Sequence, residues 1–518
     1  MLIAVLAFTT GCGGVTTNNG IIQLQSGPVR GKVEVGVRVF LGIPYAAPPV
    51  GELRWQPPQE VASWTDVKES KDFGPACPQP KEQAGGQYSE DCLYLNVWTP
   101  PAKNDQRLPV MVWIHGGAFN FGSASQAEYD GINLAKKGVV VVTINYRLGP
   151  LGFFVHPLLS KESVQGTSGN YGLLDQIAAL QWVQNNIAAF GGNPDQLTIF
   201  GQSAGSRSVS LLTISPLAAG LFHRAIAQSG GPIIGSEYLN PNFNGSLSGV
   251  LKMGEKLATR LGGDKAPDVL AVLRAKSAEE IIKAADCSTS IFDYEALFFA
   301  PVFDGWVLPE NPLRAFEEGR QHDVPIIVGS TANEGTLYLT EETDLSVEKY
   351  QSFLKARFAG ETQKASEIFP AREAKDVGPA IDHVLTVAAN AEPARLMAQS
   401  MERKKNPAYL YQFTRRPDTA LARKLGVHHG VDLAYVFGNM AKSDGYDDTD
   451  LELSGKMIDY WVNFAKTGNP NGEGLPDWPA YKSQSDINLE FAGRVRTNTN
   501  LYKYQCDFIS DMLYRYWK

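Results

Sequence analysis

Short runs of β-branched and aromatic residues alternate along this chain with longer helix-like stretches. The runs that read as buried strands are 108–114, 139–145, 196–200, 225–228, 324–328 and 408–413. Between the second and the third run, the stretch 172–189 places most of its apolar side chains on one face of a helix. Strands that alternate with helices predict an α/β fold with a mostly parallel central sheet and helices on both faces. In such a sheet, the loops after the strands carry the chemistry.

The composition fits one large globular domain. Of 518 residues, 43% are hydrophobic, which supplies enough apolar material for a large core. No linker-like stretch, charge run or internal repeat divides the sequence. We therefore expect a single domain over residues 20–518, with long insertions. A net charge of −8 without a basic cluster argues against a nucleic-acid partner.

The amino terminus has the pattern of an export signal. Residues 1–8 are apolar and lead through Thr9, Thr10 and Gly11 to Cys12, but the run is too short to span a membrane. No Lys or Arg precedes it, and Thr9 stands where lipid-attachment sites typically have Leu. We predict that residues 1–19 direct export to the periplasm or the medium. A lipid anchor at Cys12 is the one membrane link we consider, and a cytosolic protein is the alternative.

Cys77 and Cys92 are the cysteines best suited to form a disulfide. A short segment rich in Pro, Gly and Gln separates them, and export would place them in an oxidising compartment. Cys287 and Cys506 remain either free or paired across the fold.

The segment Gly201-Gln202-Ser203-Ala204-Gly205 lies between a strand-like run and the helix-compatible segment 206–213. A serine hydroxyl is a weak nucleophile at neutral pH, so it must be exposed at a sharp turn beside a base. Flanking glycines let the backbone pass closely through such a turn. The order of strand, turn and helix makes Ser203 a candidate nucleophile, with a merely structural turn as the alternative.

A second glycine-rich loop, His115-Gly116-Gly117, follows the run 108–114. Backbone amides in such a loop stabilise the negative charge that develops on a carbonyl oxygen during acyl transfer. We expect the amides of Gly116, Gly117 and Ala204 to form an oxyanion hole. His115 is expected to brace this loop rather than to act as a base.

Two late histidines are candidates for the base. His428 and His429 lie in a glycine-flanked loop after the run 408–413, and these residues alone leave both open. The other histidines lie before the nucleophile or in segments that fit a structural or solvated role better.

The acid is expected between the nucleophile and the base, after the run 324–328. Glu334 fits this position, where it would accept the imidazole Nδ1 proton and fix the tautomer of the base. Asp304 and Asp323 are rivals by spacing, but each fits a turn better.

These motifs together resemble the type B carboxylesterase family, which includes cholinesterases, bile-salt-activated lipase and bacterial para-nitrobenzyl esterases. The segments 190–205 and 90–100 fit its two signatures, and the likeness runs from about Val29 to the carboxyl terminus. The resemblance implies the α/β-hydrolase fold and the hydrolysis of small-molecule carboxylic esters. Nothing in the residues calls for a metal or a cofactor.

The resemblance also implies individual roles. The family's base precedes a glycine, which selects His429 over His428, and its acid lies in the segment 333–335. Cys77 and Cys92 would form the family's first disulfide.

Four further residues stand near the expected site. Ser229 and Asp432 look like outer groups that hold the triad, with ordinary polar contacts near a turn as the alternative. The family usually has Glu immediately before the nucleophile, whereas this chain has the neutral Gln202. Arg207 is a candidate contact for an acidic substrate, with a structural ion pair as the alternative. No Trp lies between Cys77 and Cys92, so choline esters are poor candidates.

We therefore predict a serine carboxylesterase that forms an acyl-enzyme on Ser203, with Glu334 and His429 completing the triad. The alternatives are a lipase that acts on longer acyl chains and a cholinesterase-like binding module without activity. The residues give no indication of the oligomeric state.

Overall fold

The computed structural model describes residues 20–80, 87–101, 107–232, 247–287, 290–293 and 296–516. The predicted export signal, including Cys12, lies outside these residues. Within them, none of the helices combines the length and the apolar character needed to cross a membrane.

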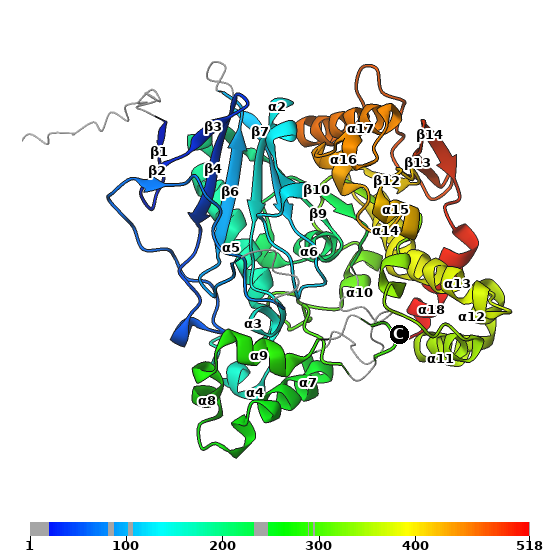
Figure 1. The fold of residues 1–518 in the computed structure, drawn as a ribbon, viewed down its shortest axis with the longest axis horizontal. Helices are drawn as coiled ribbons and strands as arrows, with labels where there is room; N and C mark the ends of the chain where they lie inside the picture. The colour runs from blue at the N-terminus through cyan, green and yellow to red at the C-terminus, as the bar shows by residue number, and fades with distance from the viewer. Residues whose placement is uncertain are drawn as a thin grey trace, which may run out of the picture.

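An 11-stranded sheet runs through the described part of the molecule (Figure 1). Neighbouring strands are parallel from β8 to β13, whereas the outer strands at both edges are antiparallel to their neighbours. This pairing confirms the predicted mostly parallel sheet. In spatial order, the strands are β14 (Val495–Thr499), β13 (Ile487–Phe491), β12 (Ala408–Phe413), β11 (Ile326–Thr331), β10 (Arg224–Gln228), β9 (Gly192–Gln202), β7 (Leu108–Ile114), β8 (Val140–Ile144), β6 (Tyr94–Thr99), β4 (Val37–Pro44) and β3 (Lys32–Glu34). A separate small sheet contains β1 (Ile21–Gln23), β2 (Pro28–Arg30) and β5 (Lys68–Glu69).

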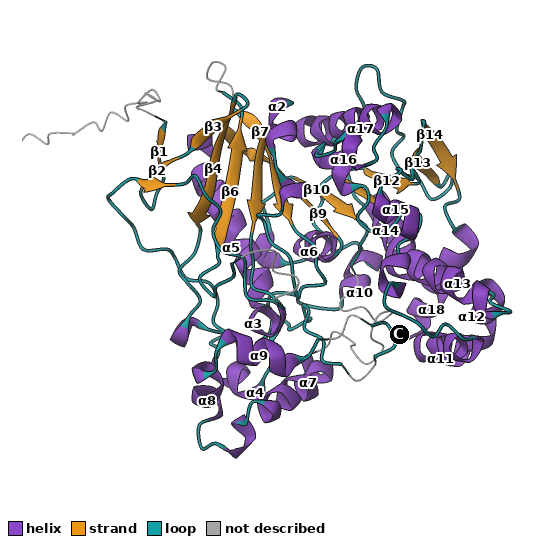
Figure 2. Cartoon of the chain, viewed as in Figure 1, coloured by secondary structure: helices purple, strands orange, loops and turns teal. Residues whose placement is uncertain are grey.

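Helices cover both faces of the large sheet (Figure 2). Alternate side chains of β7 enter two different cores, with Val110 and Val112 in one and Met111 and Trp113 in the other. The first core includes residues of α5 (Tyr171–Asn186), α6 (Ala204–Leu212) and α14 (Glu392–Ser400). The second includes residues of α2 (Ile132–Lys136), α16 (Leu433–Phe437) and α17 (Asp448–Thr467).

Two helical insertions lengthen the connections of the sheet. The first lies between β10 and β11 and contains α7 (Leu247–Arg260), α8 (Val269–Ala275), α9 (Ala278–Ala285) and α10 (Pro312–Glu317). The second lies between β11 and β12 and contains α11 (Val347–Phe358), α12 (Thr362–Ile368), α13 (Ala374–Thr386) and α14. The second insertion shares a third core with the last helix, α18 (Lys503–Tyr516), at the right of Figure 1. The remaining α-helices of the described residues are α3 (Gly149–Phe153), α4 (Pro157–Glu162) and α15 (Ala420–Leu425).

Helix α5 differs from the one-sided amphipathic helix expected over 172–189. It ends at Asn186, and its buried residues lie all round the helix because β9, α6 and α3 pack against it. Asp175 is fully buried and accepts hydrogen bonds from the Arg147 guanidinium at 2.7 and 2.8 Å. This ion pair allows a charged side chain on an otherwise enclosed helix.

Candidate active site

Ser203 occupies the sharp turn between β9 and α6. Its backbone angles, φ 59° and ψ −122°, fall in a region that residues other than glycine rarely adopt. Both flanking glycines are needed for close packing. A Cβ on Gly205 would lie 1.9 Å from the carbonyl oxygen of Ile114, and one on Gly201 would lie 2.5 Å from the carbonyl carbon of Gly205. The strained turn leaves Ser203 partly exposed at the carboxyl edge of the sheet.

Glu334 and His429 are joined directly. Nδ1 of His429 donates a short hydrogen bond to Oε2 of Glu334, whose side chain is 0% exposed. Oε1 of Glu334 accepts from the amide of Thr331 at 2.6 Å, and the amide of Glu334 donates to Oγ1 of Thr386 at 3.0 Å. Thr331 thus fixes the carboxylate and Thr386 fixes the backbone of Glu334, and the carboxylate places the imidazole proton on Nδ1.

The other ring nitrogen of His429 contacts Gln202. The side-chain amide nitrogen of Gln202 donates to Nε2 of His429 at 3.1 Å. In the described residues, the hydroxyl of Ser203 makes no hydrogen bond. For His429 to act as the predicted base, its Nε2 must accept from the Ser203 hydroxyl in place of the neighbouring amide.

Of the three amides predicted to form the oxyanion hole, that of Ala204 follows Ser203 in the chain and that of Gly116 belongs to a residue packed against Ser203. A Cβ on Gly116 would lie 3.1 Å from the Cβ of Ser203. Gly117 has φ +105°, and a Cβ there would lie 1.9 Å from the carbonyl oxygen of Phe121. Ala204 begins α6, where an amide has no partner within the helix. Among the described residues, no acceptor takes a hydrogen bond from the amides of Gly116 and Gly117.

His115 braces this loop. Its ring is buried and stacks on Tyr146 at a centroid distance of 4.4 Å. Burial lowers the pKa of His115 to about 4, so the neutral ring donates from Nδ1 to the carbonyl oxygen of Gly116 at 2.8 Å. The hydroxyl of Tyr146 donates to the carbonyl oxygen of His115 at 2.9 Å.

The loops that carry the acid and the base are hydrogen-bonded to each other. The amide of Asn333 donates to the carbonyl oxygen of Val427 at 3.0 Å, and the amide of Val427 donates to Oδ1 of Asn333 at 2.9 Å. Asp382, on α13, accepts from the amide of Gly335 and from the side chain of Asn333, both at 2.8 Å. Burial raises the pKa of Asp382. Asp382 was not predicted from the sequence, because nothing in the local pattern of the second insertion marks it.

The rival base, His428, and one rival acid, Asp323, form other contacts. His428 is buried, and its Nδ1 lies 3.0 Å from the carbonyl oxygen of His429 rather than beside a carboxylate. Asp323 accepts from the amides of Lys405 and Asn406 at 3.4 and 3.1 Å. Both side chains therefore serve local backbone contacts.

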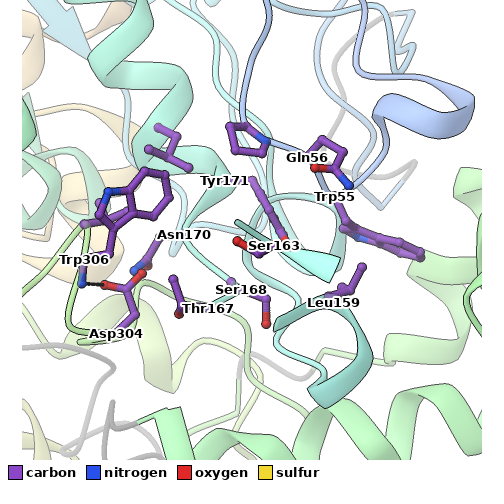
Figure 3. A pocket seen from close by; sticks show the side chains of 14 residues that line it. Trp55, Gln56, Leu159, Ser163, Thr167, Ser168, Asn170, Tyr171, Asp304 and Trp306 are labelled. Atoms are coloured by element: carbon purple, nitrogen blue, oxygen red, sulfur yellow. Dashed lines mark hydrogen bonds between the residues drawn. The ribbon is translucent and has the colours of Figure 1, made fainter. Parts of the chain in front are cut away.

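The other rival acid, Asp304, lines a different hollow (Figure 3). Its Oδ1 accepts from the amides of Trp306 and Leu308 at 3.1 and 3.0 Å, as expected for a turn residue. The walls of this hollow include Trp55 and Tyr171. None of its lining residues belongs to the predicted triad or oxyanion hole.

Comparison with known proteins identifies the family. Residues 18–509 match the model of the carboxylesterase family. The chain belongs to this family. The para-nitrobenzyl esterase of Bacillus subtilis is 38% identical, over 90% of this chain and 93% of that protein. The fumonisin B1 esterase of Sphingopyxis macrogoltabida is 36% identical, over 92% of this chain and 87% of that protein.

A solved structure of a PNB esterase has a TM-score of 0.82 at 36% identity, and the match covers 95% of this chain and 100% of that one. The α/β-hydrolase fold and the assignment to the type B carboxylesterases are thereby confirmed. The chain is a carboxylic ester hydrolase.

In this carboxylesterase, the predicted outer groups Asp432 and Ser229 are both buried. Oδ2 of Asp432 accepts from Nε2 of Gln228 and from the hydroxyl of Tyr411, both at 3.0 Å. Burial raises the pKa of Asp432 to about 6. Ser229 has φ 52°, and its buried hydroxyl has no partner among the described residues. Neither side chain forms a hydrogen bond to His429 in this part of the chain.

Arg207 lies one helical turn after Ser203 and is 9% exposed. Its amide donates to the carbonyl oxygen of Ser203 at 3.0 Å. Within the described ranges, its guanidinium forms none of the ion pairs that the structural alternative requires.

Cys77 and Cys92 form the predicted disulfide. Cys287 and Cys506 are free, which decides between the two alternatives left open for them, and burial raises the pKa of both thiols. The described residues contain no group of three or more His, Cys, Asp or Glu side chains suited to hold a metal ion.

Proposed function

We propose that this carboxylesterase works through Ser203 as nucleophile, His429 as general base and Glu334 as the group that orients the base. The observation that carries the proposal is the hydrogen bond from Nδ1 of His429 to the buried Glu334. It presents an unprotonated Nε2 next to the partly exposed turn at Ser203.

In the first half-reaction, Nε2 of His429 takes the hydroxyl proton of Ser203 while Oγ attacks the carbonyl carbon of the ester. The negative charge that moves to the carbonyl oxygen is met by the amides of Gly116, Gly117 and Ala204. Glu334 stabilises the imidazolium that forms.

The intermediate then collapses. His429 gives its proton to the alcohol oxygen, the bond between this oxygen and the acyl carbon breaks, and the acyl group remains on Ser203. A water molecule attacks the acyl-enzyme while His429 takes its proton. Return of this proton to Oγ of Ser203 releases the carboxylic acid and restores the enzyme.

Labelling with a fluorophosphonate probe tests the nucleophile. We expect one label on the intact protein, attached to Ser203, and none on Ser203→Ala. Ser352→Ala is a matched control, because Ser352 is an exposed serine on α11. An unlabelled intact protein, or equal labelling of Ser203→Ala, would contradict the proposal.

We also propose that the protein is exported, with residues 1–19 as the signal and Cys12 as the residue to examine for lipid. The Cys77–Cys92 disulfide supports export, since structural disulfides persist in oxidising compartments. Cell fractionation with mass determination of the mature amino terminus tests both points, and an uncleaved cytosolic protein would contradict export.

A further inference from the structure

Arg207 differs from the other buried arginines of the described residues. Arg54, Arg147 and Arg395 donate to carboxylates, and Arg357 donates to backbone carbonyl oxygens. Arg207 is equally enclosed, yet its guanidinium donates to no acceptor in the described part of the chain. Its donors are therefore available to a partner that this part of the chain does not provide.

A carboxylate ligand would stabilise this arrangement. A guanidinium stays charged at physiological pH, and burial disfavours that charge unless a partner of opposite charge offsets it. Burial lowers the pKa of Arg207, and the nearby Tyr338 and Glu334 act in the opposite direction. Glu334 accepts no hydrogen bond from Arg207 in the described residues; its two oxygens accept from the amide of Thr331 and from His429.

The guanidinium belongs to the face of α6 that carries the nucleophile. Ser203 and Arg207 are four residues apart, and their backbones are hydrogen-bonded at 3.0 Å, so they stand on the same side of the helix. Side chains on a helix lean towards its amino terminus, which here is the turn at Ser203. Burial raises the pKa of Tyr338, and the nearby charge of Arg207 opposes this rise. The ring centroid of Tyr338 lies 6.3 Å from that of His429.

We propose that Arg207 binds a carboxylate of the substrate, so that the enzyme acts on esters that carry a free carboxylate in addition to the ester group. A carboxylate accepts two parallel hydrogen bonds from a guanidinium and balances its charge. The neutral Gln202 beside His429 favours the same substrates, because a carboxylate at this position would repel them. The inference rests on the proposed function and adds its substrate class.

The test compares matched pairs of esters. One pair carries the charge on the acyl half, namely the 4-nitrophenyl ester of glutarate and the same ester with its free carboxylate methylated. The other pair carries it on the alcohol half, namely 4-acetoxybenzoate and its methyl ester. The readout is the ratio of kcat/KM for the charged ester to that for the neutral ester.

We expect Arg207→Gln to lower this ratio for at least one pair by roughly 10- to 100-fold. Arg207→Lys should lower it less, since it keeps the charge but loses the two-donor geometry. Arg314→Gln is the control and should leave the ratio unchanged, because Arg314 lies on α10 with 63% of its side chain exposed. Equal ratios in the wild type and in Arg207→Gln for both pairs would overturn the proposal.

A measurement on the wild type alone avoids dependence on the folding of the variants. Glutarate should inhibit hydrolysis of the neutral esters competitively and more strongly than glutaramide, whereas equal inhibition by the two would also overturn the proposal. Fluorophosphonate labelling distinguishes failure of the substrate class from failure of the proposed function. If Ser203 is labelled but the ratio of kcat/KM is the same in the wild type and in Arg207→Gln, only the substrate class is wrong. If the intact protein is not labelled, the proposed function is wrong.

Discussion

The side-chain amide of Gln202 donates to Nε2 of His429 at 3.1 Å, the nitrogen that takes the proton of Ser203 in the proposed mechanism. The proposed base is therefore in contact with an uncharged side chain, which belongs to the residue immediately before the proposed nucleophile. A carboxylate in the same place would attract the imidazolium and keep the base protonated at higher pH.

Replacement of Gln202 by Glu should move the acidic limb of the pH profile. We expect the rise of kcat/KM with pH, measured on a neutral ester, to shift upward by about 1 pH unit or more, because a carboxylate at 202 stabilises the protonated base. Gln202→Met is the uncharged control and should shift the limb much less. An unchanged limb in Gln202→Glu would contradict the contact, and wild-type activity undiminished well below about pH 5 would contradict a histidine base.

Asp382 should act as a positioning residue for Glu334. In Asp382→Asn, an amide NH₂ replaces one of the oxygens that accept from Gly335 and Asn333, which loosens the acid loop. We expect kcat to fall roughly 10- to 100-fold, while fluorophosphonate still labels Ser203 at a reduced rate. Asp448→Asn is the control, at a carboxylate that is 86% exposed on α17. A variant with wild-type kcat would show that the loop does not need this support.

Gly117→Ala should damage the oxyanion loop. The added methyl group would lie 1.9 Å from the carbonyl oxygen of Phe121, so the loop must move. We expect kcat to fall roughly 100-fold or more, the usual loss when an oxyanion donor is displaced. Gly138→Ala is matched in having positive φ (+87°) but open space around the new methyl group, and it should retain kcat. Equal kcat in the two variants would count against an oxyanion role for this loop.

Glu392 gives a prediction about stability and pH. It is buried on α14, where Oε1 accepts from Ser510 of α18 at 2.8 Å and Oε2 has no partner among the described residues. Burial raises the pKa of Glu392 from 4.5 to about 7, with the charge of Arg395 opposing the rise. The folded state therefore binds this proton more tightly than the unfolded state. The resulting stabilisation is full below pH 4.5 and is lost as the pH rises through 7.

Glu392→Gln removes this dependence. We expect the variant to gain up to about 3 kcal/mol in the free energy of unfolding relative to the wild type at pH 8, and much less at pH 5. Urea denaturation at the two pH values measures the difference, with the exposed Glu367→Gln on α12 as control. A gain that is the same at both pH values would show that Glu392 does not titrate between them.

The predicted strands agree best with the structure where both faces of the sheet are covered. The runs 108–114 and 408–413 coincide with β7 and β12, because strands buried on both sides are continuously apolar. The run 324–328 is displaced, since β11 covers Ile326–Thr331 and its polar end pairs with β12. The edge strands β13 and β14 were not predicted, because pairing with a neighbour rather than composition makes their segments extended.

The residues of the candidate site also differ in how far the sequence could predict them. Ser203 and the glycine loop could be located from short motifs, because a few consecutive residues build each turn. Glu334 and His429 are 95 residues apart, so only chain order and family resemblance could pair them. The contact of Gln202 with His429 and the unpaired Arg207 are tertiary facts that no local pattern contains.

Capture of the acyl-enzyme tests the central claim most directly. The enzyme is mixed with a 4-nitrophenyl ester, quenched in acid during turnover and digested. The masses of the peptides are then determined by mass spectrometry. We expect a burst of nitrophenol approaching one equivalent and one acyl group on the peptide that contains Ser203, with neither in Ser203→Ala. An acyl group on another residue, or hydrolysis by Ser203→Ala at the wild-type rate, would contradict the account.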